Sequence, residues 1–298
     1  MKLVTIDGRE VAGRPGVLLD SGDVLDLAIA PSTLAESQWI PYSVVSILAA
    51  GESGADNVRN LIDAADSADD DTRQRLTEAG GLSPLASTPL MSPLRRPGLM
   101  LISFSSSQGE ALRNRVYIKS PNTAAGNDAT VTLPCSDRGK IIATPLLCAI
   151  LGRPLHEATA AEAHEAIAAY TLLIEFETVD LDADTGASWR AFVESKQFPE
   201  SCPMGPAMVT VDEINNPAHL QVNVSINGVA SAQGALLDSV VDPAAVVADL
   251  SQRYGFSTGD LVAFATREQG ALDIEVQPGD ELSFELPGIM TLDTRLSV

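Results

Sequence analysis

Short apolar runs that alternate with polar residues and end at turn residues constrain the fold of this chain most strongly. In the clearest run, residues 220–226, apolar and polar residues alternate, and Asn227-Gly228 follows at once. An alternating run that ends in Asn-Gly is the strongest local signal for a β-hairpin. Further short apolar runs occupy residues 2–6, 16–19, 24–27, 129–133, 172–177 and 208–211. Many strands with few helices predict a mainly β fold whose sheet is rolled or closed.

Helices are predicted at only a few places. Residues 43–48 and 60–65 are typical of short helices, and the acidic residues 66–71 that follow indicate a solvated loop. The capping box Thr159-Ala160-Ala161-Glu162 predicts a helix that begins there and runs to about Tyr170. Asp242-Pro243 provides an N-cap and a first-turn proline for a further helix, with an apolar stripe at Val246, Leu250 and Tyr254.

The length and composition of the chain indicate one large domain with a lobe attached. The chain has 298 residues, of which 45% are hydrophobic, so it has enough apolar material for a packed core and is not disordered. Prolines at 84, 89, 93 and 97 are typical of a connector. We therefore expect a small N-terminal α/β lobe over residues 1–80, a Pro-rich connector over 81–97 and the main domain over 98–298.

The charge of the chain excludes several classes of partner. Lys and Arg number 19 against 40 Asp and Glu, which gives a net charge of −21. Such a field repels nucleic acid and anionic lipid, so the expected partner is a small molecule. No run approaches the roughly 20 apolar residues that span a bilayer, and residues 1–7 lack the apolar run of a signal peptide. These features predict a cytoplasmic protein.

Cysteine, histidine and glycine patterns offer no cofactor site. Three widely spaced cysteines without a CxxC pair predict neither a disulfide framework nor a thiolate zinc site. The three histidines are interpreted as solvated or capping residues and not as metal ligands or catalytic groups. No GxGxxG or GxxxxGK[ST] loop is present, so a nucleotide cofactor is not expected. The cysteines are Cys135, Cys148 and Cys202, and the histidines are His156, His164 and His219.

A series of short motifs follows in a fixed order along nearly the whole chain. They are Tyr117-Ile118-Lys119-Ser120-Pro121, Ile150-Leu151-Gly152-Arg153, Lys196-Gln197-Phe198, Pro203-Met204-Gly205-Pro206, Asn227-Gly228, Gly259-Asp260 and Gly279-Asp280. In this order the set resembles the fumarylacetoacetate hydrolase family. The resemblance implies an α+β, mainly β fold: a mixed β-sheet roll around a pocket, with a small N-terminal lobe, in a homodimer.

The chemistry that the resemblance implies is only partly matched by the residues present. The family holds a divalent metal with a Glu-x-Glu pair and an Asp, and these positions correspond here to Thr144, Leu146 and Glu175. The family also uses a His-x-x-Glu dyad in a lid, whereas residues 99–155 contain no histidine and Glu110 has no partner there. We therefore expect no bound metal, no other cofactor and no metal-dependent hydrolysis of a C–C bond.

Three ionisable residues remain as candidate catalytic groups. Strand alternation places Glu175 and Glu177 on one face, and the resemblance brings Lys196 near the same pocket. Two carboxylates beside one lysine can move a proton or hold a substrate oxygen. The other interpretation, which the sequence leaves open, is a buried salt bridge that only neutralises charge.

Six further residues are candidates for binding substrate. Tyr117 and Lys119 face the same side of a strand and could contact an oxyanion, although the pattern alone favours a strand edge with a solvated lysine. Ser105 lies in a serine-rich run that offers hydroxyl donors or forms a flexible loop. Arg113 could clamp an acidic head group or serve as a surface counter-charge. Two positions come from the resemblance, namely Met204 and Thr266.

The leading functional hypothesis is a metal-independent small-molecule enzyme. A shaped cavity can promote cyclisation, cycloaddition, isomerisation or a lyase step by orientation and hydrogen bonding. The expected substrate is a polyketide-like dicarbonyl or enone of specialised metabolism. One alternative is a metal-dependent C–C hydrolase or decarboxylase of β-dicarbonyl acids, and another is a non-catalytic binding subunit whose pocket is filled by side chains.

Overall fold

The structure is a computed structural model of the 298-residue chain. It describes residues 1–8, 13–35, 39–105, 115–134, 139–180, 189–214, 216–237, 241–266 and 272–298, with the backbone alone at residues 105, 180, 189 and 266. The α-helices are α1 (Ala30–Thr33), α2 (Val44–Ala49), α3 (Gly51–Asp66), α4 (Asp70–Glu78), α5 (Ala160–Ala166), α6 (Trp189–Glu194) and α7 (Pro243–Ser251).

Strands dominate the rest of the described chain, as predicted. They are β1 (Lys2–Ile6), β2 (Arg14–Leu18), β3 (Asp23–Asp26), β4 (Leu82–Pro84), β5 (Leu90–Met91), β6 (Met100–Ser105), β7 (Arg115–Lys119), β8 (Ala124–Ala125), β9 (Ala129–Thr132), β10 (Gly139–Leu151), β11 (Ile167–Asp180), β12 (Cys202–Pro203), β13 (Met208–Thr210), β14 (Gln221–Ile226), β15 (Val229–Ala235), β16 (Leu261–Thr266), β17 (Ile274–Val276), β18 (Glu281–Leu286) and β19 (Met290–Ser297).

All of these strands except β8 and β12, which pair with each other, lie in two large mixed sheets. The first has 12 strands, in the order β4-β3-β2-β1-β13-β11-β10-β16-β6-β7, with β17 paired to β10 and β5 paired to β1. The second has five strands, in the order β15-β14-β18-β19-β9. Both contain parallel and antiparallel pairs, because β16 runs parallel to β6 and β19 runs parallel to β9. The fold is therefore α+β and mainly β, with mixed sheets, as expected from the sequence.

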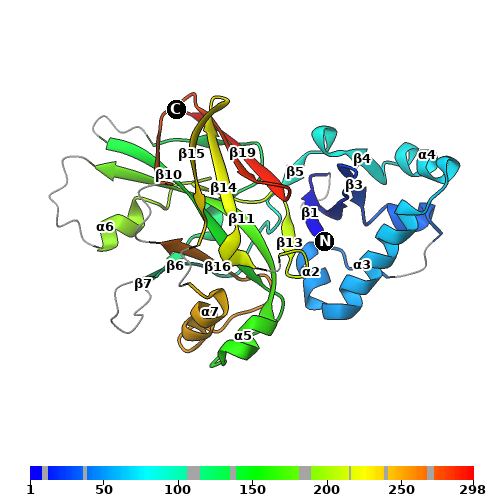
Figure 1. Cartoon of the computed structure of the whole chain (residues 1–298), viewed down its shortest axis with the longest axis horizontal. Coiled ribbons are helices and arrows are strands. Elements are labelled where there is room, and N and C mark those ends of the chain that lie inside the picture. Colours follow the sequence, from blue (N-terminus) through cyan, green and yellow to red (C-terminus); the bar gives the residue numbers. More distant parts are fainter. Residues whose placement is uncertain are drawn as a thin grey trace.

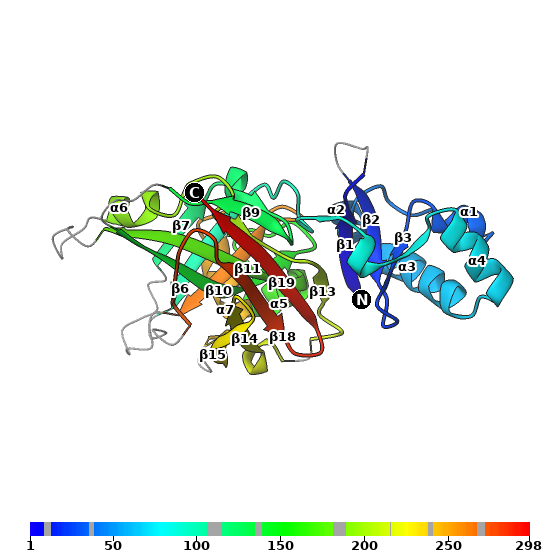
Figure 2. The ribbon, with the colours of Figure 1, turned by 90° about the horizontal axis from the view of Figure 1, so that it is seen from above.

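The N-terminal elements gather at one end of the molecule (Figures 1 and 2). Their antiparallel strands β1, β2 and β3 continue the large sheet, because Lys2 and Leu3 of β1 pair with Val209 and Met208 of β13. Two short strands from the proline-rich segment join the same end, since β4 pairs with β3 and β5 with β1. The proposed division into a lobe, a connector and a main domain stays a prediction.

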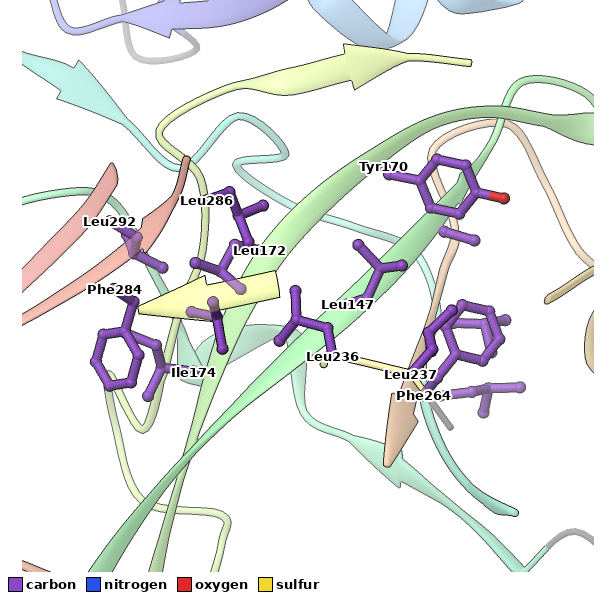
Figure 3. Packing of buried hydrophobic residues seen from close by; sticks show 14 of the residues in the cluster. Leu147, Tyr170, Leu172, Ile174, Leu236, Leu237, Phe264, Phe284, Leu286 and Leu292 are labelled. Carbon is purple, nitrogen blue, oxygen red and sulfur yellow. The ribbon is translucent and has the colours of Figure 1, made fainter. Parts of the chain in front are cut away.

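The long antiparallel pair β10–β11 divides the buried apolar residues into two layers. Because side chains alternate along a strand, Leu147 faces one layer, whereas Leu146 and Cys148 face the other. Figure 3 shows the first layer, in which Leu147, Leu172 and Ile174 from this pair lie near residues of β16, β18 and β19. The second layer contains the opposite face of β10 and β11 together with apolar residues of β6, β7 and the N-terminal strands and helices.

The capping box begins a helix as predicted, but the helix is shorter than expected. Thr159 accepts a hydrogen bond from the Glu162 N–H, and the Glu162 side chain accepts one from the Thr159 N–H. The expectation of a helix to about Tyr170 is wrong, because α5 ends at Ala166 and β11 begins at Ile167. The apolar residues from Ile167 onward pair with β10, and this tertiary pairing outweighs the helix propensity of the preceding alanines.

Most of the remaining local predictions are confirmed. Asn227 and Gly228 adopt positive φ values of 52° and 75° and connect β14 to β15 in a hairpin. Asp242 caps α7 by accepting from the Ala244 N–H, although α7 ends at Ser251 and leaves Tyr254 outside it. The acidic segment is not a continuous loop, because α3 ends at Asp66 and α4 begins at Asp70.

Three further findings concern helices, cysteines and histidines. No helix within the described ranges is long and apolar enough to cross a membrane. The two described cysteines, Cys148 and Cys202, are buried and free, and Cys135 lies outside the described residues. All three histidines are exposed, which agrees with their interpretation as solvated residues.

Candidate active site

Glu175 is the centre of a buried polar group on the face of β11 that looks toward the second apolar layer. It lies directly opposite Thr144 in the β10–β11 pair, and Glu177 follows two residues later on the same face. The Glu175 residue is only 3% exposed. A carboxylate in such a position must be paired or hydrogen-bonded to stay charged.

Three donors surround the Glu175 carboxylate. The Lys196 Nζ atom lies 3.2 Å from Oε2, and the Lys119 Nζ atom lies 3.5 Å from Oε1. The Tyr117 hydroxyl donates a short hydrogen bond to Oε1. The structure therefore brings together three of the sequence-predicted residues around a fourth, and both carboxylate oxygens are engaged.

Lys119 is completely buried, which corrects the preferred interpretation from the sequence. The strand pattern favours a solvated lysine at a strand edge, yet the side chain is 0% exposed. Besides its contact with Glu175, its Nζ atom donates a short hydrogen bond to the backbone carbonyl of Lys196. β7 is indeed the last strand of its sheet, but the segment that follows α6 covers it, and sequence periodicity does not show such a cover.

The segment after α6 holds Lys196 in place. Its backbone is bound to β11 at both ends, because the Thr178 N–H donates to Ser195 O at 3.2 Å and the Phe176 N–H donates to Ser201 O at 3.0 Å. The Gln197 side chain binds β7 and the residue after it, because Nε2 donates to the Ile118 carbonyl at 3.3 Å and Oε1 accepts from the Ser120 N–H at 2.9 Å. The segment thus bridges β11 and β7, the strands that carry Glu175 and Lys119.

Glu177 forms the outer part of the group. Its Oε2 atom lies 2.5 Å from the Lys196 Nζ atom. The Glu177 side chain is 23% exposed, compared with 5% for Lys196 and 4% for Glu175. Solvent therefore reaches this part of the group at Glu177, whereas the other charged members lie beneath it.

The protonation states of the inner residues follow from their surroundings. Burial alone would raise the pKa of the Glu175 carboxyl, but the Lys196 and Lys119 ammonium groups together with the Tyr117 hydrogen bond outweigh burial and lower that pKa below its usual range. Burial and the Glu175 carboxylate raise the pKa of the Tyr117 hydroxyl well above its usual range. Glu175 is therefore an anion at neutral pH, and Tyr117 is a neutral hydrogen-bond donor.

Three aromatic rings adjoin the polar group. The centroids of Phe104 and Tyr117 are 6.0 Å apart with a near-parallel stacking angle of 29°. The Phe192 ring meets both edge-on, at 5.7 Å from Phe104 and 6.3 Å from Tyr117. The Lys196 Nζ atom lies 4.6 Å from the centroid of the Phe192 ring, within reach of a cation–π interaction.

The two buried thiols near this group are not nucleophiles. Burial raises the pKa of the Cys202 thiol to about 12, and burial also raises the pKa of Cys148 well above its usual range. The thiolate is the reactive form of cysteine, and at neutral pH neither residue provides it. Covalent catalysis by these cysteines therefore has no support in the structure.

The positions that correspond to the family's metal ligands lie together, but their side chains do not fit a divalent cation. Thr144 lies opposite Glu175, and Leu146 follows on the same face of β10. Leu146 offers no oxygen, the Thr144 Oγ1 atom donates to Asp273 at 2.7 Å, and Glu175 is engaged by two ammonium groups. Within the described part of the chain, no group of three His, Cys, Asp or Glu residues could hold a metal.

The remaining predicted binding residues are not brought into contact with this group by the described atoms. Met204 is fully buried in the second apolar layer, where its backbone N–H donates to Ala125 O. Ser105 and Thr266 lie opposite each other at the ends of β6 and β16, with only their backbones described. Arg113 lies outside the described residues.

Sequence reasoning missed three residues at the site. The alternation in β6 places Phe104 on the same face as Met100 and Ile102, so the period of two carried a usable signal for Phe104. Phe192 and Gln197 gave no such signal, because they depend on how α6 and the segment after it fold over β7 and β11.

The arrangement is suited to chemistry at a carbonyl group. An ammonium group of Lys196 can stabilise negative charge on a substrate oxygen, and Glu175 keeps that ammonium in place. Glu177 is a carboxylate at the exposed side that can accept a proton. The aromatic rings provide an apolar surface beside these groups.

Comparison with known proteins agrees with this fold and with an enzymatic role in the family. The sequence profile described as "Fumarylacetoacetate (FAA) hydrolase C-terminal" matches residues 103–297, more than half of the chain. An oxaloacetate tautomerase of Bacillus subtilis (strain 168) is 21% identical over 296 residues, which cover 94% of this chain and 95% of that protein. A bifunctional isomerase/decarboxylase of 4-hydroxyphenylacetate degradation from Salmonella dublin is 26% identical over 58% of this chain and 39% of that protein.

Solved structures share the fold over the full length. The maleylpyruvate hydrolase of Sphingobium sp. SYK-6 superposes with a TM-score of 0.74 at 19% identity, covering 100% of this chain and 99% of that one. The fumarylacetoacetate hydrolase of Exiguobacterium antarcticum gives a TM-score of 0.71 at 17% identity, with 100% and 99% coverage. Tautomerases, isomerases, decarboxylases and hydrolases of small molecules are thus among the similar proteins, and the chain belongs to the fumarylacetoacetate hydrolase family.

Proposed function

We propose that this protein is an isomerase-type enzyme that acts on a carbonyl compound able to form an enolate, and that it does so without a metal. The substrate class comprises 2-oxo acids, dicarbonyl compounds and enones. Tautomerisation, cyclisation and lyase steps on such compounds share one requirement, which is stabilisation of negative charge on the carbonyl oxygen. The single observation that carries the proposal is the Lys196 ammonium, which lies against Glu175 beside the positions of the family's metal ligands.

Lys196 is the group to which we assign that stabilisation. Its ammonium is held by two carboxylates and a ring, so its position is fixed before a substrate arrives. Glu175 is the carboxylate that keeps both lysines paired in a buried site, and Tyr117 donates to it. Glu175 therefore acts through Lys196, as a positioning residue.

Glu177 is the group to which we assign proton transfer. When a C–H bond next to the carbonyl breaks, the proton passes to the Glu177 carboxylate and the electron pair forms the C=C bond of the enolate. The enolate oxygen then lies against the Lys196 ammonium, and return of the proton to oxygen completes the tautomerisation. Glu177 suits this role better than Glu175, since among the described residues Glu177 is bound by Lys196, whereas Glu175 is bound by Lys196, Lys119 and Tyr117.

Similar proteins give this proposal independent support at the level of reaction class. An oxaloacetate tautomerase matches nearly the whole chain, and other matching proteins are named as isomerases. A tautomerase or isomerase needs no added water, which suits a site whose matching stretch lacks the histidine of the family's His-x-x-Glu dyad. We favour this class over hydrolysis for that reason.

Hydrogen–deuterium exchange provides a direct test. Wild-type protein in D₂O should accelerate deuterium incorporation next to the carbonyl of oxaloacetate or pyruvate, as followed by NMR. Lys196→Met keeps most of the side-chain volume but removes the charge, and the exchange rate should fall by about a hundredfold, the usual cost of losing one donor of this kind. The thermal unfolding profile should show that the variant is folded.

A surface lysine provides the matched control. Lys140 forms a 2.5 Å ion pair with Glu275 in the exposed part of β10, so Lys140→Met makes the same change outside the site. The Lys140→Met variant should accelerate deuterium incorporation into the substrate at the wild-type rate. If a folded Lys196→Met variant accelerates deuterium incorporation as fast as wild type does, the proposed role of Lys196 is refuted. If wild type itself does not accelerate it, the proposed substrate class is refuted.

A further inference from the structure

We infer that Glu177 occupies the place of a substrate oxygen on Lys196, and that a ligand carrying a single negative charge displaces it. This inference rests on the proposed function and deepens it by naming the charge of the substrate's head group. It follows from a difference between the two carboxylates that hold the Lys196 ammonium.

The difference lies in how firmly each carboxylate is held. The Glu175 carboxylate forms ion pairs with Lys196 and Lys119 and accepts a hydrogen bond from the Tyr117 hydroxyl, and its side chain is 4% exposed. Among the described residues, Glu177 is bound by Lys196 alone, and its side chain is 23% exposed. Removing Glu175 would leave two buried ammonium groups unpaired, whereas Glu177 regains hydration when it turns outward. Displacement therefore falls on Glu177, and its carboxylate, once released from Lys196 at the exposed side of the group, is the one that takes the proton from the substrate.

The charges of the group fix the charge of the ligand. The two lysines and two glutamates sum to zero, and the neutral Tyr117 adds nothing. Once Glu177 turns outward, the described inner residues carry one uncompensated positive charge. One carboxylate or one enolate oxygen restores neutrality, whereas a second buried negative charge would again be unpaired.

The surroundings of Lys196 indicate the shape of the ligand. The Phe192 ring lies under its ammonium, and Phe104 and Tyr117 continue the aromatic surface. A flat conjugated group packs well against such rings. The ligand class is therefore a planar monoanion, such as a 2-oxo monocarboxylate or the enolate of a dicarbonyl compound.

Calorimetric titration with pyruvate tests the displacement in the full-length protein. Pyruvate is a planar monoanion with a 2-oxo group. Glu177→Gln keeps the shape of the side chain but removes the charge that competes for Lys196. We expect the dissociation constant for pyruvate to fall by about tenfold in Glu177→Gln relative to wild type. Glu177→Ala should show the same direction, because it removes the competing group altogether.

The control is Glu275→Gln. Glu275 forms an ion pair of the same length, 2.5 Å, with Lys140 on the surface, so this variant changes the net charge equally. Its affinity for pyruvate should equal that of wild type. The affinity for the dianion oxalate should rise less in Glu177→Gln than the affinity for pyruvate does, because the second negative charge of oxalate stays unpaired.

The outcomes separate this inference from the proposed function. Unchanged or weaker pyruvate binding in both Glu177→Gln and Glu177→Ala overturns the displacement, even where Lys196→Met abolishes exchange and so supports the proposed function. If Glu275→Gln binds pyruvate as much more tightly than wild type as Glu177→Gln does, the gain is a general effect of net charge, and the displacement is overturned as well. Absence of pyruvate binding in wild type and Glu177→Gln alike rejects the ligand class.

Discussion

The Lys196 Nζ atom lies 3.2 Å from Oε2 of Glu175, although 20 intervening residues separate the two in the chain. Both side chains are almost completely buried. β11 carries one member of the pair and the segment after α6 carries the other, so their contact depends on hydrogen bonds between these two segments. This contact is the basis of the predictions below.

Removal of the Glu175 charge should destabilise the protein. Glu175→Gln leaves the buried ammonium groups of Lys119 and Lys196 without their shared counter-ion, so the free energy of unfolding should fall by about 3–5 kcal/mol. Urea unfolding followed by circular dichroism measures the change. The double variant Glu175→Gln, Lys196→Met should lose less than the sum of the single losses, and strict additivity would argue against the coupling.

The contribution of Glu175 should depend on pH in a defined direction. Its pKa is lower in the folded state than in the unfolded chain, because the two ammonium groups and the Tyr117 hydrogen bond together outweigh burial. The stabilisation is therefore fully present above the unfolded carboxyl value of about 4.3 and is lost as the pH falls through the lower folded value. The difference in unfolding free energy between wild type and Glu175→Gln should shrink on acidification. A difference that grows instead would contradict the assigned shift.

Metal should be neither retained nor required. Thr144 and Leu146 stand where the family's metal ligands are expected, and Glu175 is engaged by lysines. Elemental analysis of the purified protein should find no stoichiometric Mg²⁺, Mn²⁺, Ca²⁺ or Zn²⁺, and a chelator should leave deuterium exchange unchanged. A stoichiometric metal that is lost in Glu175→Gln would reject the metal-free assignment and restore the hydrolase alternative.

The buried Ser103 hydroxyl should lower the free energy of unfolding of the protein. It is buried opposite Phe264 in the β6–β16 pair, and its Oγ atom has no hydrogen-bond partner among the described residues. Ser103→Ala should raise the free energy of unfolding by about 1 kcal/mol, because an unsatisfied buried group is removed. Ser201→Ala is the matched comparison, since its Oγ atom donates to Lys196 O at 2.8 Å. Ser201→Ala should lower the free energy of unfolding by a similar amount. If Ser103→Ala also lowers the free energy of unfolding, the Ser103 hydroxyl has a hydrogen-bond partner and the prediction is wrong.

The mainly β fold and several local features could be read from the sequence because they depend on neighbouring residues. The alternation at 220–226 with Asn227-Gly228 fixed a hairpin, and the Thr159–Glu162 capping box fixed the start of α5. The end of α5 could not be predicted in this way. Pairing of the following apolar residues with β10 decides where the helix stops. Helix propensity depends on neighbouring residues only and therefore does not include this pairing with another strand.

The same division applies to the candidate site. Alternation placed Glu175 and Glu177 on one face, and the resemblance indicated that Lys196 lay near them. Only the tertiary structure showed that Lys119 is buried, because the segment after α6 covers the edge of β7. Sequence spacing determines which side chains share a strand face, whereas burial and charge pairing depend on contacts between segments that are distant in the chain. The unequal hold on Glu175 and Glu177 is therefore a property of the folded chain alone.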